Sequence, residues 1–209
     1  MKATLLFILI FTAQHLYAQT DTGRISKRID LKKGFYRNYN EYLSNSPSYS
    51  PGFKVIPFYK NKADSTIIGG EYELTDSSKD IGNNWGFCDG ESVFVKYAEF
   101  NQEEKYWKLN NGMFPFFTYK YKNNYSFDPL TTIASALSGH HLDLILINNK
   151  GKFKNATLFN VRKILKTFPD LEKSFEKLTR KYETDQFQSE EEKKVIKEFL
   201  LNANILTIK

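Results

Sequence analysis

The sequence predicts an α+β protein in which an antiparallel β-sheet is followed by helices. Up to about residue 156, short β-prone runs alternate with turns rich in Gly, Asn and Asp, which is typical of hairpins. After residue 157 the apolar period changes from two to about 3.6, which is typical of helices. Because strands and helices are segregated along the chain, the pattern favours α+β over alternating α/β. We expect a sheet of hairpins, as a roll or an open barrel, and then about three helices.

The first residues have the layout of a secretory signal peptide. Lys2 precedes the apolar run Leu5–Phe11, and the segment closes at Ala18. The run is shorter than the roughly 20 residues that span a bilayer. We therefore expect export, a mature chain without an integral membrane span, and a periplasmic or extracellular location in a bacterial envelope. The expected organisation is 1–18 signal peptide, 19–33 loose basic arm, 34–156 antiparallel β domain and 157–206 helical lobe packed on it.

The strands follow in order. Phe53–Tyr59 contains Pro57, which suits a sheet edge or a bulge. In the next strand, Ile67–Leu74, the pair Gly69-Gly70 indicates a bulge or a close approach of another backbone. Three hairpins are then predicted, over residues 85–97 with a turn at Asp89-Gly90, over 106–121 and over 142–156. Short helices are expected at Tyr39–Leu43 and Leu130–Leu137.

One predicted strand is apolar on both faces. Alternation places Phe117, Tyr119 and Tyr121 on one side of this strand. Phe114 and Phe116 lie on the other side. We therefore expect both faces of this strand to be at least partly covered.

The predicted helices each carry one apolar stripe. The stripes comprise Val161, Ile164, Leu165 and Phe168, then Leu171, Phe175, Leu178 and Tyr182, then Ile196, Phe199, Leu200 and Ala203. Pro169-Asp170 separates the first two helices. Ser189 followed by Glu192 is a capping-box pattern that begins the third.

Charge and cysteine content limit the class of protein. The formal charge is +6, and without Lys2 it is 29 − 24 = +5, which is mild and interspersed, so no nucleic-acid partner is expected. The densest basic stretch, residues 24–37, could contact anionic lipid or polysaccharide, although a solvated arm is the preferred interpretation. Cys88 is the only cysteine, which excludes an internal disulfide and suits a bacterial envelope better than an animal extracellular space.

Two motifs support this location. The segment Gly34–Pro47 (GFYRNYNEYLSNSP) and the hairpin Trp85–Glu91 (WGFCDGE) resemble motifs of an uncharacterised family of secreted bacterial envelope proteins. The likeness covers roughly residues 33 to 125, and a strand resembling Phe114–Phe117 also recurs. The resemblance implies export and a common domain, and it supplies no catalytic residue.

Candidates for catalysis are few. Cys88 could act as a nucleophile with His140 or His141 as base and Asp143 orienting the imidazole. A buried structural thiol is the preferred interpretation, because Cys88 lies beside a hairpin turn rather than at a helix N-terminus. Neighbouring histidines on a strand point to opposite faces, so neither a metal site nor a cofactor is expected.

Aromatic residues supply the candidates for binding. Trp85, Trp107, Tyr119 and Tyr121 could line a pocket or stack on a sugar if the helices leave one sheet face open. Filling of the core is the simpler interpretation. The sequence thus favours an exported, non-catalytic protein that binds a partner protein, an envelope component such as a glycan, or a small ligand. The alternative is a cysteine/histidine-dependent envelope hydrolase.

Overall fold

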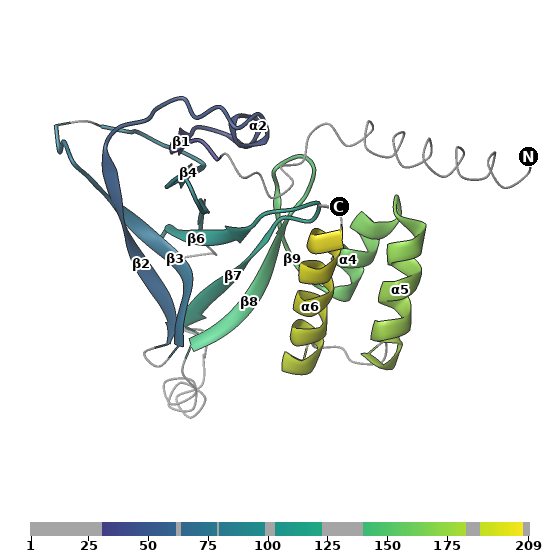
Figure 1. Cartoon of the computed structure of the whole chain (residues 1–209). Coiled ribbons are helices and arrows are strands. Elements are labelled where there is room, and N and C mark those ends of the chain that lie inside the picture. The colour runs from purple at the N-terminus through teal and green to yellow at the C-terminus, as the bar shows by residue number, and fades with distance from the viewer. Residues whose placement is uncertain are drawn as a thin grey trace, which may run out of the picture.

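The fold combines a curled antiparallel sheet with C-terminal helices, which confirms the predicted α+β class (Figure 1). The computed structural model describes residues 31–61, 64–78, 80–98, 103–122, 140–182 and 189–206. The strands are β1 (Gly34–Tyr36), β2 (Phe53–Asn61), β3 (Asp64–Leu74), β4 (Gly86–Cys88), β5 (Val93–Tyr97), β6 (Lys105–Asn110), β7 (Phe116–Lys122), β8 (His140–Ile147) and β9 (Phe153–Asn155). The helices are α2 (Tyr39–Leu43), α4 (Leu158–Leu165), α5 (Pro169–Thr179), the 3₁₀ helix η1 (Arg180–Tyr182) and α6 (Glu190–Leu206).

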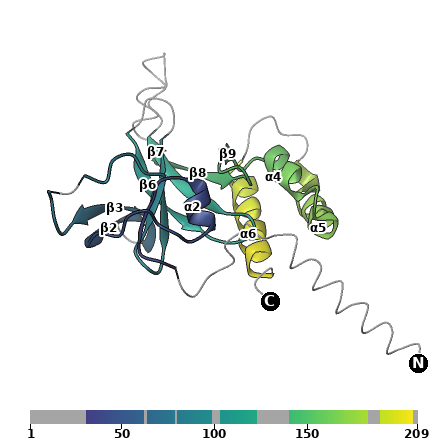
Figure 2. The same cartoon turned by 90° about the horizontal axis from the view of Figure 1, so that it is seen from above.

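The sheet branches at β6. Its main path runs β1-β4-β5-β6-β7-β8-β9, and the hairpin β2–β3 lies off this path. One edge of β6 pairs with β5, whereas the other edge is divided between two partners. Tyr106 and Trp107 pair with β3, and Leu109 and Asn110 pair with β7. Because β3 and β7 leave β6 in different directions, the sheet opens into a half-barrel, with the β2–β3 hairpin as a separate wing (Figures 1 and 2).

Close backbone approach explains a glycine at the branch. A Cβ on Gly69 would lie 2.5 Å from the carbonyl oxygen of Tyr106, so the pairing of β3 with β6 requires glycine there. The predicted close approach is confirmed. Pro57 lies on β2, whose pairing partner among the described strands is β3, and the register of this hairpin shifts after Phe58. Proline is tolerated on such an edge because no ladder hydrogen bond needs its nitrogen.

The first predicted hairpin is confirmed with its tip moved by one residue. Asp89 pairs with Ser92, its amide donating to the Ser92 carbonyl at 3.2 Å, so Gly90 and Glu91 form the tip. Gly90 has a φ of +105°, which favours glycine. The Asp89 carboxylate accepts hydrogen bonds from the amides of Glu91 (2.8 Å) and Ser92 (2.7 Å) and so holds the turn.

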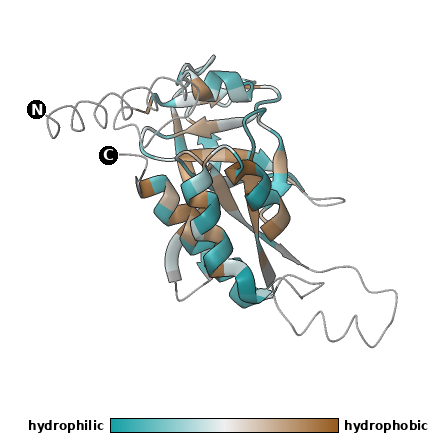
Figure 3. Ribbon diagram, turned by 90° about the vertical axis from the view of Figure 1, so that its right-hand side faces the viewer, coloured by the Kyte–Doolittle hydropathy of each residue, from teal (hydrophilic) through white to brown (hydrophobic). Residues whose placement is uncertain are grey.

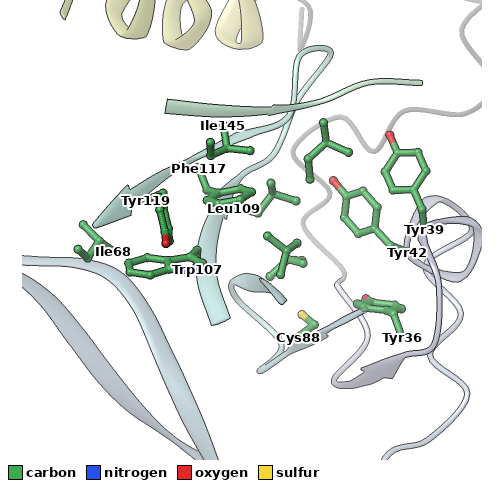
Figure 4. Close-up of a cluster of buried hydrophobic side chains, with 13 residues drawn as sticks. Tyr36, Tyr39, Tyr42, Ile68, Cys88, Trp107, Leu109, Phe117, Tyr119 and Ile145 are labelled. Carbon is green, nitrogen blue, oxygen red and sulfur yellow. The ribbon is translucent and has the colours of Figure 1, made fainter. Parts of the chain in front are cut away.

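Strands β7 and β8 contribute side chains to two cores. Phe117, Tyr119 and Ile145 point into the half-barrel, where they join a cluster that includes Trp107 and Cys88 (Figure 4). On the other face, Phe116, Leu144 and Leu146 pack with the helices. Figure 3 shows the strands brown and the outer helix faces largely teal, in keeping with this arrangement. The prediction that both faces are covered is confirmed, so the face expected to remain open for a ligand is filled here.

The helices follow the predicted stripes with one correction. The Ser189 hydroxyl accepts from the Glu192 amide at 3.1 Å, as the capping pattern predicts, and α6 buries Ile196 and Leu200 completely. Leu178, predicted to be buried, is 52% exposed. Thr179 is buried in its place, and its buried hydroxyl is satisfied by donating to the carbonyl of Phe175 at 2.8 Å.

Other predictions concern the ends and the loops. The predicted helix Tyr39–Leu43 is confirmed as α2, whereas β1 was not predicted. Lys32 and Lys33, assigned to the loose arm, are held against the sheet: the Lys32 amide donates to Asn45 at 3.0 Å and the Lys33 ammonium donates to the Phe53 carbonyl at 3.1 Å. The predicted helix 130–137 lies outside the described residues. Among the described helices, none is both long and apolar enough to span a bilayer.

Candidate functional site

The thiol of Cys88 lies in the core rather than at a surface. Cys88 is 0% exposed and belongs to the cluster of buried side chains inside the half-barrel (Figure 4). Burial raises the pKa of the thiol to about 11, and the charge of Asp89 also raises it, although the Gly90 amide donates to Sγ at 3.3 Å. A thiol that is buried and neutral at physiological pH does not act as a nucleophile.

The candidate partners of Cys88 lie elsewhere along the strands. Cys88 is in register with Val93 of β5, and it shares the half-barrel core with Ile145 of β8. His141 pairs with Tyr121, four residues farther along β8, or about 13 Å at strand rise. The backbone register therefore separates the thiol from both histidines, whose side chains lie outside the described part of the structure.

Asp143 has a structural partner. Its carboxylate accepts from the ammonium of Lys193 on α6 at 2.5 Å, and the Asp143 and Lys193 side chains are 21% and 15% exposed. Lys193 also donates to Glu190 and to the Leu142 carbonyl. Burial alone lowers the pKa of Lys193, but these carboxylates outweigh burial and leave the pKa raised. Asp143 thus holds α6 to the sheet.

Two of the candidate aromatic residues, Trp107 and Tyr119, fill the half-barrel. Trp107 and Tyr119 are 4% and 2% exposed, and their rings meet edge to face with centroids 5.1 Å apart. Trp85 is partly buried against Tyr39 and Tyr42 of α2. Trp107 and Tyr119 are core residues. The side chain of Tyr121 lies outside the described residues.

A pocket of about 270 Å³ lies where the β8–β9 turn faces α4. Leu146 and Ile164 supply apolar lining, while Lys154 of β9 and Lys163 of α4 line the pocket from the strand side and the helix side. The remaining lining residues are polar, namely Asn148, Asn149, Asn160 and Thr167. Typical pockets for drug-sized ligands measure about 300–1,000 Å³, so this one suits a single small polar group.

The walls of the pocket are fixed by short-range hydrogen bonds. The Asn148 side-chain oxygen accepts from the amides of Lys150 (2.9 Å) and Lys152 (3.0 Å), which sets the turn. On the other side, Asn160 donates from its side chain to the Asn155 carbonyl at 2.9 Å. Thr157 caps α4 through its hydroxyl, which accepts from the Asn160 amide at 3.2 Å. The lysines are thus carried on a fixed backbone.

The chain segment that lines the pocket is strongly basic. Between Asp143 and Asp170 the chain contains no acidic residue. The basic residues in this stretch, which we call the basic segment (residues 144–169), are Lys150, Lys152, Lys154, Arg162, Lys163 and Lys166. All five lysines are exposed, and within the described part of the chain no ion pair neutralises Lys154 or Lys163. The pocket therefore has a local positive potential suited to an anion.

Sequence reasoning overlooked this segment although its signal was present. Residues 24–37 have the highest density of basic residues in the chain. The basic segment is less dense in Lys and Arg, but it contains no acidic residue. Because Lys154 lies on β9 and Lys163, nine positions away, lies on α4, only the structure reveals that they line one pocket.

The described residues contain no candidate metal site. No three His, Cys, Asp or Glu side chains among them come together in a way that could hold a metal ion. No family model matches the sequence, and no curated protein or solved structure matches it significantly.

Proposed function

We propose that the protein is an exported component of a bacterial envelope that binds an anionic group of an envelope constituent in the pocket between the β8–β9 turn and α4. The observation that carries this proposal is the placement of Lys154 and Lys163 on either side of one small pocket within a segment free of acidic residues. Two ammonium groups can donate charge-assisted hydrogen bonds to one phosphate or carboxylate.

The size and lining of the pocket limit the ligand class. A volume of about 270 Å³ fits a phosphomonoester or an acidic sugar unit rather than a large cofactor. Leu146 and Ile164 would contact the carbon skeleton, while the asparagines would hydrogen bond to hydroxyl groups. The export part of the proposal rests on the N-terminal segment that contains the apolar run Leu5–Phe11 and closes at Ala18.

The hydrolase alternative receives no support from the described residues. It requires an accessible, ionised Cys88, and the thiol is buried with a raised pKa. We therefore keep binding as the proposed activity.

Calorimetric titration tests the binding proposal. Glycerol phosphate and glucuronate should bind, and glucose, which is uncharged, should not. The double variant K154A/K163A should weaken anion binding by tenfold or more, because each charged hydrogen bond contributes about 1.5–3 kcal/mol. The control K173A/K177A removes the same charge from exposed positions on α5 and should change affinity little. Equal losses in both double variants, or no binding by the wild type, would overturn the proposal.

Export is tested separately. The full sequence expressed in a bacterium should yield an envelope-fraction protein whose mass corresponds to a chain that begins at Gln19. A chain that stays in the cytoplasm with residues 1–18 attached would contradict the export proposal.

A further inference from the structure

The helix that forms one wall of the pocket also presents an exposed aromatic ring. Phe159, the second residue of α4, is 72% exposed, the highest value among the exposed large apolar side chains of the described residues. Val161 and Leu165 face the core from the opposite side of this helix and are fully buried. Residues four apart lie on one helix face, so Phe159 and Lys163 are neighbours there.

The position of Phe159 separates it from the other exposed apolar residues. Ile56, Tyr59, Leu178 and Ile205 also exceed one third exposure, but all four lie outside the basic segment. Phe159 alone among them belongs to the chain segment that carries five exposed lysines and no acidic residue. An exposed aromatic ring beside lysines suits the surface of an anionic membrane, where anionic headgroups cover an apolar interior.

We propose that this surface docks onto an anionic lipid bilayer, with Phe159 inserted at the boundary between headgroups and acyl chains. The lysines of the basic segment face lipid phosphates, and the pocket between Lys154 and Lys163 holds one headgroup phosphate. This inference rests on the proposed function, since it names the source of the anion that the same pocket binds.

Two features favour a bilayer over a soluble anion. A free phosphate or an acidic polysaccharide would satisfy the lysines but would leave the Phe159 ring in water. A bilayer accommodates both the lysines and the ring. Each Lys near an anionic membrane surface raises the partition coefficient of the protein about fivefold. Burying a phenylalanine ring adds roughly tenfold or more.

The test places a fluorescent reporter at the proposed insertion point. Phe159→Cys is labelled with the environment-sensitive dye NBD; the native thiol, Cys88, is 0% exposed and does not compete for the label. The matched control is Leu178→Cys on α5, where Leu178 is 52% exposed. The processed chain is used, so that residues 1–18 do not contribute to lipid binding. Vesicles contain phosphatidylcholine alone or equal parts phosphatidylcholine and phosphatidylglycerol.

At position 159 we expect the dye emission to shift to the blue and brighten with the vesicles that contain phosphatidylglycerol, but not with those of phosphatidylcholine alone. At position 178 we expect no change with either. In sedimentation of the same vesicles, Phe159→Ser should lower the partition coefficient about tenfold and Leu178→Ser should leave it unchanged.

The outcomes separate this inference from the proposed function. If glycerol phosphate binds the wild type through Lys154 and Lys163 but the dye at position 159 does not respond, the pocket stands and bilayer docking is overturned. Saturable binding of soluble alginate with an unresponsive dye likewise overturns docking and makes the surface a polysaccharide site. If the dye responds to anionic vesicles while K154A/K163A binds glycerol phosphate like the wild type, docking stands and the role of the pocket is overturned.

Discussion

Asn204 pairs both ends of its carboxamide with the backbone of Phe114. The Phe114 amide donates to Oδ1 at 2.8 Å, and Nδ2 donates to the Phe114 carbonyl at 3.0 Å. Asn204 is 4% exposed on α6, and Phe114 lies in the loop between β6 and β7. The Asn204 side chain thus supplies the two backbone hydrogen bonds that a neighbouring strand would otherwise make with Phe114. It also holds α6 against the sheet.

Asn204→Ala should destabilise the fold by about 2–4 kcal/mol. The substitution leaves two buried backbone groups without these hydrogen bonds, and each such group costs about 1–3 kcal/mol. Urea unfolding measures the loss. Asn202→Ala, at an exposed position of the same helix, should change the unfolding free energy by less than about 0.5 kcal/mol. Equal effects of the two substitutions would contradict the assigned role.

Gly69→Ala should destabilise the branch of the sheet. The added methyl group would lie 2.5 Å from the Tyr106 carbonyl oxygen, so β3 must move away from β6. We expect a loss of about 1–3 kcal/mol in thermal or urea unfolding. Ser65→Ala, at an exposed position of the same strand, provides the control. A neutral Gly69→Ala would mean that β3 does not approach β6 this closely.

Asp143→Asn should weaken the attachment of α6 to β8. Lys193 would keep its charge at a largely buried position while losing its closest carboxylate, for an expected cost of about 1–2 kcal/mol. The comparison is Glu73→Gln, which breaks an ion pair with Lys54 whose side chains are 57% and 71% exposed. That pair should contribute at most about 0.5 kcal/mol. The idea fails if both substitutions have the same effect on the urea midpoint.

Stability should fall as the pH rises above about 9. Burial raises the pKa of the Cys88 thiol from 9.0 to about 11, and it raises the pKa of Tyr36, Tyr42 and Tyr106 well above 10. The unfolded chain therefore loses these protons first, and alkaline pH favours unfolding. The stabilisation is complete below about pH 9 and is lost as the pH passes through the folded-state values.

Unfolding free energies at about pH 8 and about pH 10.5 measure this loss. Cys88→Ala should reduce the slope between these conditions, because one of the groups no longer titrates. A stability that does not change over this interval would show that these groups are more accessible to solvent than the structure indicates.

Local patterns in the sequence predicted many elements of the fold. The alternation in residues 114–121 reflects two real cores, and the Ser189 cap follows from short-range hydrogen bonding at a helix N-terminus. The tip of the Asp89-Gly90 hairpin was shifted by one residue, because turn residues fix a turn more reliably than its register.

What sequence reasoning missed depends on long-range geometry. The division of the β6 edge between β3 and β7 has no local signature, and β1 has three residues, too few for a period to show. Asn204 contacts a residue 90 positions away. The pocket lies between strand and helix elements that bring Lys154 of β9 and Lys163 of α4 to one lining, and no local pattern in the sequence indicates this.

The double role of β7 and β8 has a consequence for cooperativity. Phe116 and Leu146 lie in the helix-side core, while their neighbours Phe117 and Ile145 lie in the half-barrel core. Neither core can lose these strands without exposing the other to water, so the sheet and the helices should melt in one transition rather than two. The segregation of strands and helices along the chain therefore does not make them autonomous folding units.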